Sequence, residues 1–547
     1  MTDRCSTLGV LVLAACGCAV MGTARSSAAA RDEYWTGWRA RQRAETASLP
    51  KPPVPVPGKG AAIDRFLAAY WAKHNFEPMN VVDDSAFARR VYLDVIGLLP
   101  TAEQLEQFRH DRNPDKRGKL VDSLLADKQG YAEHWMSFWN DLLRNDEQTN
   151  IDGLRKPITS WLYVSLLENK PVDLFVAELL NPGKDGPDGY LKGVNWRGRV
   201  NASQTPPVQA AQNVSQVFLA SALKCASCHD SFVNQWKLAQ AYGLASFFSP
   251  QDLEMHRCDK PTGRIAAPKF LFPGLGEVPA GADLSARHRA VAEMVTRPKN
   301  PRFAKTMVNR LWKRLLGRGL FEPVDDFDSK PAHSDLLEWL AFDFMEHDYD
   351  AKHTLRLILL SRVYQSPVSH LKPASAKELP LLIGPVERRL TSEQYLDAIS
   401  QVTGYWPKTD TMAVRVANPH IRAWRQRKPD ALASALGRPN REQVCTERNQ
   451  DSTVLQALEL VNGSALNQRL QGGAKHLLAS EWGSEQQTAK VVEALYCRAL
   501  GRLPGRAEID LVQPLLGSPQ EKAESRQEGW EDALWGMFMN PEFQFIR

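Results

Sequence analysis

The chain has only 8 cysteines in 547 residues, too few for disulfides to hold together a protein of this size. It has no glycine-rich phosphate loop, serine-nucleophile elbow or His-Glu-x-x-His motif, so the usual carriers of nucleotide and hydrolase chemistry are missing. Beyond residue 30 no apolar run approaches ~20 residues, so no transmembrane helix is expected. Net charge is also low, at +5 with acidic and basic residues interspersed, which argues against nucleic-acid binding.

The most informative feature that is present is the pentad Cys225-Ala226-Ser227-Cys228-His229. A Cys-x-x-Cys-His run is the attachment signal for c-type haem. Its spacing places two thiols on one helical turn, where they can add to the two vinyl groups of one porphyrin. The adjoining imidazole can then bind the iron. The pattern predicts one covalent haem c on Cys225 and Cys228, with His229 as the axial iron ligand.

Two other chemistries use the Cys-x-x-Cys spacing. A thiol redox pair usually lies in a thioredoxin-like βαβ unit, whereas the flanks of this motif look helical. A zinc site needs a second ligand pair, and no other Cys-x-x-Cys exists; Cys258, Cys445 and Cys497 stand alone. A structural disulfide or thiol pair is therefore the main alternative to haem.

The sixth iron ligand is left open by the sequence. Met255 and His256 follow the motif within reach; methionine would raise the reduction potential, histidine would lower it, and an open position would permit ligand chemistry. Further candidates are Met79, Met136 and His134. Apolar residues downstream of the motif are expected to form either haem-pocket walls or ordinary helix core. They are Phe232, Trp236, Leu238, Tyr242, Leu244, Phe247 and Phe248.

The N-terminus predicts export. Arg4 precedes an apolar run over residues 8–15 that is too short for a mature transmembrane helix. The run ends in a lipobox-like sequence with Cys16 as the residue that would carry acyl chains, and the rival cleavage site is the alanine stretch 28–30. Both predict a periplasmic or cell-envelope protein, whose membrane contact would be limited to a lipid anchor at Cys16.

The rest of the chain predicts a mainly α-helical protein of two helical domains, the first of which carries the haem motif. Thr101 with Gln104 and Thr391 with Gln394 have the spacing of helix-starting capping boxes. The expected organisation is an export signal (1–30), a proline-rich extended spacer (31–60), a cytochrome-c-like domain (61–265), a linker (266–295) and a companion domain (296–547).

A helix is expected over residues 303–316, where apolar residues recur at helical spacing and Gly317 supplies a stop. Its other side is basic and predicts either a solvated helix face or a docking surface for an acidic partner. The basic residues are Arg302, Lys305, Arg310, Lys313 and Arg314. The acidic stretch that follows is expected to serve loops and helix caps, or to hold a divalent cation. Its candidate ligands are Asp325, Asp326, Asp328, His333 and Asp335.

Several motifs resemble a known pair of families. The motif with its continuation through Gln235-Trp236 and the run 242–245 resembles the planctomycete cytochrome-c-like domain of unknown function. The second half resembles the planctomycete-specific domain that usually accompanies it. The matching segments are 300–304, 309–312, 317–320, 323–327, 361–365, 388–391 and 458–463.

The resemblance implies an exported haem protein and no particular substrate. Many members have a second histidine two residues after the haem histidine, and this chain has Ser231 there.

The expected function is electron transfer to an unidentified redox partner protein by a monohaem c-type cytochrome-like protein. The alternatives are a haem-dependent oxidoreductase with an open iron site and a non-haem cell-surface interaction protein. No enzymatic activity is assigned beyond this alternative, and nucleic acid is not an expected partner.

Overall fold

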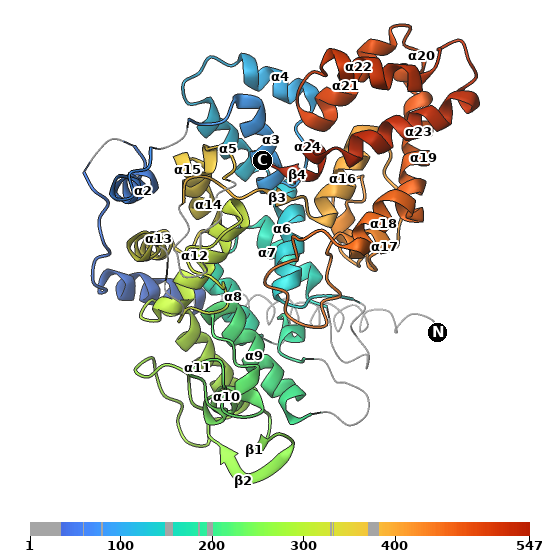
Figure 1. Cartoon of the computed structure of the whole chain (residues 1–547). Coiled ribbons are helices and arrows are strands. Elements are labelled where there is room, and N and C mark those ends of the chain that lie inside the picture. The colour runs from blue at the N-terminus through green and yellow to red at the C-terminus, as the bar shows by residue number, and fades with distance from the viewer. Residues whose placement is uncertain are drawn as a thin grey trace, which may run out of the picture.

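The computed structural model describes residues 34–57, 60–77, 80–147, 157–183, 186–193, 201–328, 331, 333–369 and 382–547. It is mainly α-helical, as expected, with two short two-stranded sheets among the described residues (Figure 1). None of the described helices combines the length and the apolar content that crossing a membrane requires.

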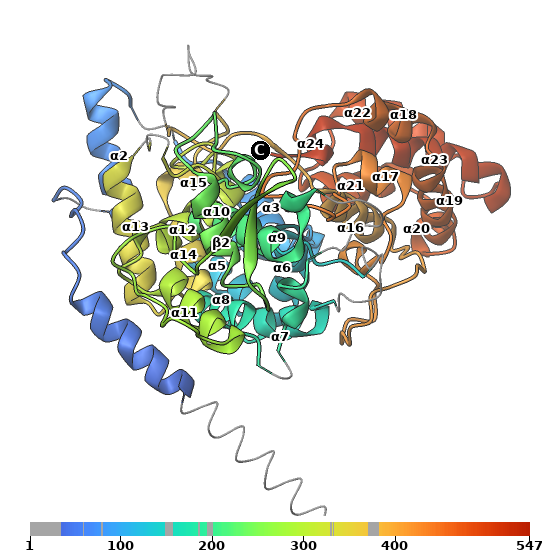
Figure 2. The same cartoon turned by 90° about the horizontal axis from the view of Figure 1, so that it is seen from below.

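The helices fall into two groups in chain order, and Figure 2 shows the second group, in orange and red, on one side of the molecule. The first group is α2 (Ala62–Lys73), α3 (Asp84–Val95), α4 (Ala102–His110), α5 (Lys116–Ala126), α6 (Lys128–Leu142), α7 (Thr159–Leu167), α8 (Val172–Leu180), α9 (Pro206–Leu219), α10 (Leu238–Ala245), α11 (Leu284–Thr296), α12 (Pro301–Leu316), α13 (Ser334–Glu346), α14 (Ala351–Leu359) and α15 (Arg362–Gln365). The second is α16 (Ser392–Thr403), α17 (Ala431–Ala435), α18 (Val454–Asn462), α19 (Ser464–Leu478), α20 (Glu481–Ser484), α21 (Thr488–Leu500), α22 (Arg506–Val512), α23 (Ala523–Met539) and α24 (Pro541–Gln544).

One of the two strand pairs joins neighbouring segments of the chain, and the other joins distant segments. β1 (Leu253–Arg257) and β2 (Lys260–Ala266) form an antiparallel hairpin after α10. β3 (Arg388–Arg389) pairs antiparallel with β4 (Phe545–Ile546), which ties the start of the second helical group to the end of the chain.

The region expected as an extended spacer is partly helical. Residues 34–47 form a helix whose Trp38 is buried against the first core. The indole of Trp38 and the guanidinium of Arg39 both donate hydrogen bonds to the buried carboxylate of Asp173. The proline-rich segment 50–57 forms no helix or strand, as a PPII-type sequence should. The expectation of a spacer was based on composition. It did not take into account the apolar area that the aromatic residues of 34–47 bury.

Two clusters of buried apolar side chains form the cores. The first reaches from Trp38 to Trp424 and includes residues of every helix from α2 to α14. The second is built from α16 to α24, with Leu93 and Leu99 from the first group inserted into it. The expected boundary at 266–295 therefore does not coincide with a gap in the core: α11 begins within it and packs against α8.

Helix α12 is central to this shared core. Its apolar stripe is buried as expected, and it packs on α9, the helix that precedes the Cys-x-x-Cys-His motif. Gly317 ends it at a φ of 75°, which an L-residue adopts only with strain. Both expected capping boxes are present, at the starts of α4 and α16.

Candidate functional site

The cysteine motif lies on a single turn between α9 and α10. Residues Cys225–Ser227 form a 3₁₀ turn in which the Cys225 carbonyl accepts hydrogen bonds from the backbone N–H groups of Cys228 and His229. Cys225 is exposed, Cys228 and His229 are half-buried, and the intervening Ala226 and Ser227 are buried. Ala226 and Ser227 therefore face the protein interior, whereas Cys225, Cys228 and His229 face outward.

The His229 ring is oriented by the main chain. Its Nδ1 lies 2.7 Å from the Asp230 carbonyl oxygen, which fixes the proton on Nδ1 because a carbonyl can only accept. Nε2 then carries the lone pair, and among the described residues none hydrogen-bonds to it. In metal-ligating histidines, one ring nitrogen typically donates to a carbonyl or carboxylate, as Nδ1 does here, and the second nitrogen binds the metal.

Cys258 lies beside the motif, which the sequence interpretation missed when it placed this cysteine alone. Cys258 and Asp259 form the two-residue turn of the β1–β2 hairpin with φ values of 46° and 65°. The backbone N–H of Cys258 donates to the Cys228 carbonyl at 2.9 Å. Burial, followed by the side-chain interaction with the neighbouring Cys258, raises the pKa of Cys228. The sequence signal for this hairpin was weak, because only the first strand alternates apolar and polar residues and the second is mostly polar and exposed.

The expected haem walls divide into two kinds. Phe232 is 89% exposed and lies on the surface next to the motif, as does Val233, which was not among the expected walls and is 81% exposed. The rings of Phe232 and His229 are 4.7 Å apart. The other residues lie in the first hydrophobic core or pack against it, where they form ordinary helix packing. They are Trp236, Leu238, Tyr242, Leu244, Phe247 and Phe248.

The candidate distal ligands lie in different environments. Met255 is buried in the first core, whereas His256, next to it on β1, is half-buried and lines a cavity of about 340 Å³ with Tyr242 and Asp259. Met136 and His134 are buried on α6, where burial lowers the pKa of His134 well below its usual value. Met79 and Cys16 lie outside the described residues.

The donor set of the turn fits a haem attached at the surface. Two outward thiols, an imidazole with Nε2 available and an adjacent exposed aromatic ring are the groups that a c-type haem needs. Cys225, Cys228 and His229 would hold the group, and the exposed Phe232 ring lies next to His229. None of the five cavities described is lined by a residue of the motif.

The basic side of α12 is engaged within the chain. Arg302 pairs with Asp328, Lys305 with Glu338, Arg310 with Asp325, and Lys313 with Glu322 and Glu447. Both expectations for this side, a solvated face and a docking surface, are wrong for most of it, because neighbouring loops fold acidic residues onto it. Two of the acidic residues expected as caps or cation ligands, Asp325 and Asp328, are the partners in these ion pairs.

A second feature that sequence reasoning missed is a cavity of about 300 Å³ where the two cores meet. Side chains of α6 and α12 form one side, and the segments 386–391 and 445–450 form the other. Its apolar lining includes Phe138, Leu142, Val324 and Val386, and its charged lining is mainly arginine. Residues more than 300 positions apart build this cavity, so no local sequence pattern could announce it.

A buried ionic network supports one wall of the cavity. Arg448 donates to both carboxylate oxygens of Glu393 and to Asp141, and Arg441 also donates to Asp141. Burial acts to raise the pKa of Glu393, but the charges of Arg448, Arg438 and Arg441 hold that pKa well below its usual value. The carboxylate is therefore charged in the folded protein.

This fold and this turn define a mainly α-helical protein with a surface Cys-x-x-Cys-His motif. Residues 62–252 match the family model PSCyt2, a protein of unknown function (DUF1549), and residues 287–516 match PSD1, a protein of unknown function (DUF1553). The chain belongs to the proteins that combine these two families in this order, as the sequence motifs indicated. A search of curated proteins and a search of solved structures found no match.

Proposed function

We propose that this protein is an exported monohaem c-type cytochrome-like protein that transfers single electrons to a redox partner protein. Cys225 and Cys228 hold the porphyrin by thioether bonds and His229 binds the iron. The observation that carries the proposal is the outward-facing turn, in which the Asp230 carbonyl holds His229 Nδ1 and leaves Nε2 to the metal.

Electron transfer is favoured over substrate chemistry by the position of the turn. A haem on this surface would expose an edge beside Phe232 and Val233, which are already solvent-exposed and apolar. An exposed edge allows a partner to approach closely, and a small apolar patch suits a transient protein contact. His256 is the candidate distal ligand that remains partly accessible, since Met255 is occupied in the core.

The test is an oxidised and reduced absorption spectrum of the full chain, expressed with export and haem-maturation machinery. A denaturing gel stained for haem is run in parallel. We expect a covalently held Soret band with a sharp low-spin α band, and its loss in Cys225→Ala/Cys228→Ala. Cys258→Ser is the matched control, because it removes a neighbouring thiol and leaves the pentad intact.

Each spectrum has a defined meaning. A high-spin spectrum that changes on addition of cyanide would replace electron transfer by a haem-dependent oxidoreductase with an open iron site. Correctly processed protein without a Soret band would refute haem attachment altogether and leave a cell-surface protein with a thiol pair. A His256→Ala variant that stays low-spin would remove this residue as the distal ligand.

A further inference from the structure

The cavity at the meeting of the two cores contains an excess of positive charge. Its lining includes five cationic side chains and three acidic ones. The cationic residues are Arg310, Lys313, Arg314, Arg388 and Arg448, and the acidic ones are Asp141, Glu387 and Glu447. Most of these charges are already paired: Arg388 binds Asp94 through two hydrogen bonds, and Arg448 binds Asp141 and Glu393.

Arg314 is the exception. Among the residues that the structure describes, its guanidinium makes no hydrogen bond and no ion pair, although it lies in the last turn of α12 and lines the cavity. Burial, followed by the charge of Arg388, lowers the pKa of Arg314 to about 10, so the group is still charged at neutral pH. Arg314 is half-buried, and a partly enclosed cation without a partner is solvated less well than one in open water.

The same position offers more than charge. Phe138, Leu142, Val324 and Val386 give the cavity an apolar part, and the volume of about 300 Å³ lies at the small end of ligand pockets. Arg314 has a planar fork of donors that matches two oxygens of one oxyanion. Arg310, although paired with Asp325, lines the same cavity and adds to the positive potential.

We propose that this cavity binds a small organic oxyanion, with the oxyanion on the Arg314 guanidinium and an apolar body against the Phe138 side. The charged group of the ligand is a carboxylate, a sulfate ester or a phosphate ester, all of which present two or more oxygens to a guanidinium. The site is independent of haem attachment, because it is built by α6, α12 and two C-terminal segments and contains no residue of the pentad.

The test is isothermal titration of the full chain with benzoate, phenyl sulfate and phenyl phosphate, and with inorganic sulfate and phosphate as probes lacking the apolar body. We expect saturable one-site binding of at least one aromatic anion that weakens as salt is raised. Arg314→Gln should lower its affinity by about tenfold or more, the size expected for a charge-assisted hydrogen bond. Arg318→Gln is the matched control, because it lies one turn further along and does not line the cavity.

A second readout separates a binding role from a structural one. Removing a half-buried cation without a partner should leave the melting temperature of the ligand-free protein unchanged or higher, whereas loss of a structural arginine lowers it. No binding by any of the five probes would overturn the proposal. Equal affinity in the wild-type and Arg314→Gln proteins would do the same.

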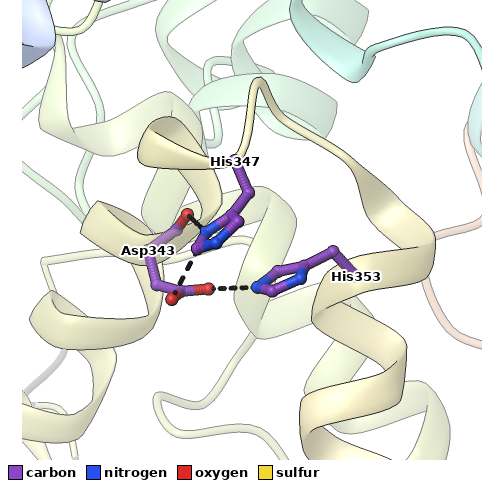
Figure 3. A group of neighbouring side chains, drawn as sticks. All are labelled: Asp343, His347 and His353. Carbon is purple, nitrogen blue, oxygen red and sulfur yellow. Dashed lines mark hydrogen bonds and ion pairs between the residues drawn. The ribbon is translucent and has the colours of Figure 1, made fainter.

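An independent cluster of side chains points to a cation site. Asp343 on α13, His347 just after it and His353 on α14 bring one ligand atom each within 4.8 Å of one another (Figure 3). His353 Nε2 lies 2.9 Å from Asp343 Oδ2, and His347 Nδ1 lies 3.4 Å from Asp343 Oδ1 and 2.8 Å from the Asp343 backbone carbonyl oxygen. Because that carbonyl accepts a hydrogen bond from Nδ1, an ion bound here must displace this hydrogen bond or use the other nitrogen of the His347 ring. The two imidazole rings stack with centroids 3.7 Å apart. Two ring nitrogens therefore converge on one carboxylate.

We infer that these three residues bind a divalent cation of the zinc type. Two imidazole nitrogens and one carboxylate oxygen are a three-ligand set that Zn²⁺ accepts, with water in the remaining position. His347 and His353 are partly exposed, at 47% and 27%, so an ion can enter from solvent. The i, i+4 spacing of Asp343 and His347 holds two of the ligands on one helical face.

The cation site is tested by titrating Zn²⁺ into Cys225→Ser/Cys228→Ser protein, so that the motif thiols do not compete. We expect one tight site, weakened by about tenfold or more in His353→Ala, as loss of a direct ligand should do at least as much as loss of an outer-shell partner. His420→Ala removes an exposed imidazole stacked on Trp406 and is the control. Equal affinity in the His353→Ala and His420→Ala proteins, or no Zn²⁺ binding, would reject the site.

Discussion

Glu393 is the residue on which the buried ionic network depends. It is 5% exposed at the start of α16, and its carboxylate faces Arg448, Arg438 and Arg441. Replacing it by glutamine keeps the size and one acceptor oxygen but removes the negative charge. Arg448 and Arg441 would then share the carboxylate of Asp141, and Arg438 would keep only its backbone carbonyl partners.

The expected cost follows from that imbalance. Breaking a buried ion pair from one side costs roughly 3–5 kcal/mol, since an uncompensated charge stays behind. The retained amide oxygen offsets part of this, so we expect Glu393→Gln to lower the free energy of unfolding by about 3 kcal/mol. Glu528→Gln, an exposed carboxylate on α23 of the same core, should change it by less than about 0.5 kcal/mol.

The assay is urea unfolding of both variants, followed by circular dichroism and tryptophan fluorescence, at several pH values. The pKa of Glu393 is lowered in the folded protein, so its contribution is present above the unfolded pKa of about 4.3 and is lost as pH falls through the folded pKa. The gap between wild type and Glu393→Gln should therefore shrink below that pH. A difference of less than about 1 kcal/mol at pH 7 would refute the network argument.

Three further outcomes follow from the structure. Trp530→Ala empties a fully buried site of the second core and should cost about 3–5 kcal/mol in urea unfolding; a loss below about 1 kcal/mol would show a loosely packed core. Gly404→Ala forces a φ of +71° on an L-residue whose Cβ would lie 2.7 Å from the His476 ring. Thermal unfolding should therefore show a loss of about 1–3 kcal/mol in the free energy of unfolding. An unchanged free energy of unfolding would contradict the strain argument. Burial lowers the pKa of His288 to about 4, so the stability of the fold should decrease as the pH falls from 6.5 to 4. In melting curves recorded over that pH range, His288→Gln should lose less stability than the wild type. The same dependence of melting temperature on pH in both proteins would contradict this prediction.

Local sequence patterns accounted for much of the helical framework. The capping boxes at Thr101 and Thr391, the stripe of α12 and its stop at Gly317 all involve residues within a few positions of one another. Such signals depend on backbone geometry and side-chain spacing, which the sequence carries directly. The pentad is local for the same reason, since its thiols and imidazole need only one turn to come together.

What the sequence could not provide depends on distant residues meeting. Cys258 reaches Cys228 because a hairpin folds back, and Arg314 is left without a partner because loops from elsewhere occupy the other basic residues of α12. The sequence also did not show how the helices divide between the two cores. Apolar periodicity indicates which face of a helix is buried, but not which helix covers that face. The sequence by itself determined the main helices and the Cys-x-x-Cys-His motif. Only the tertiary structure decided which charges are paired, which stay free and where the cavity lies, because these depend on contacts between residues hundreds of positions apart.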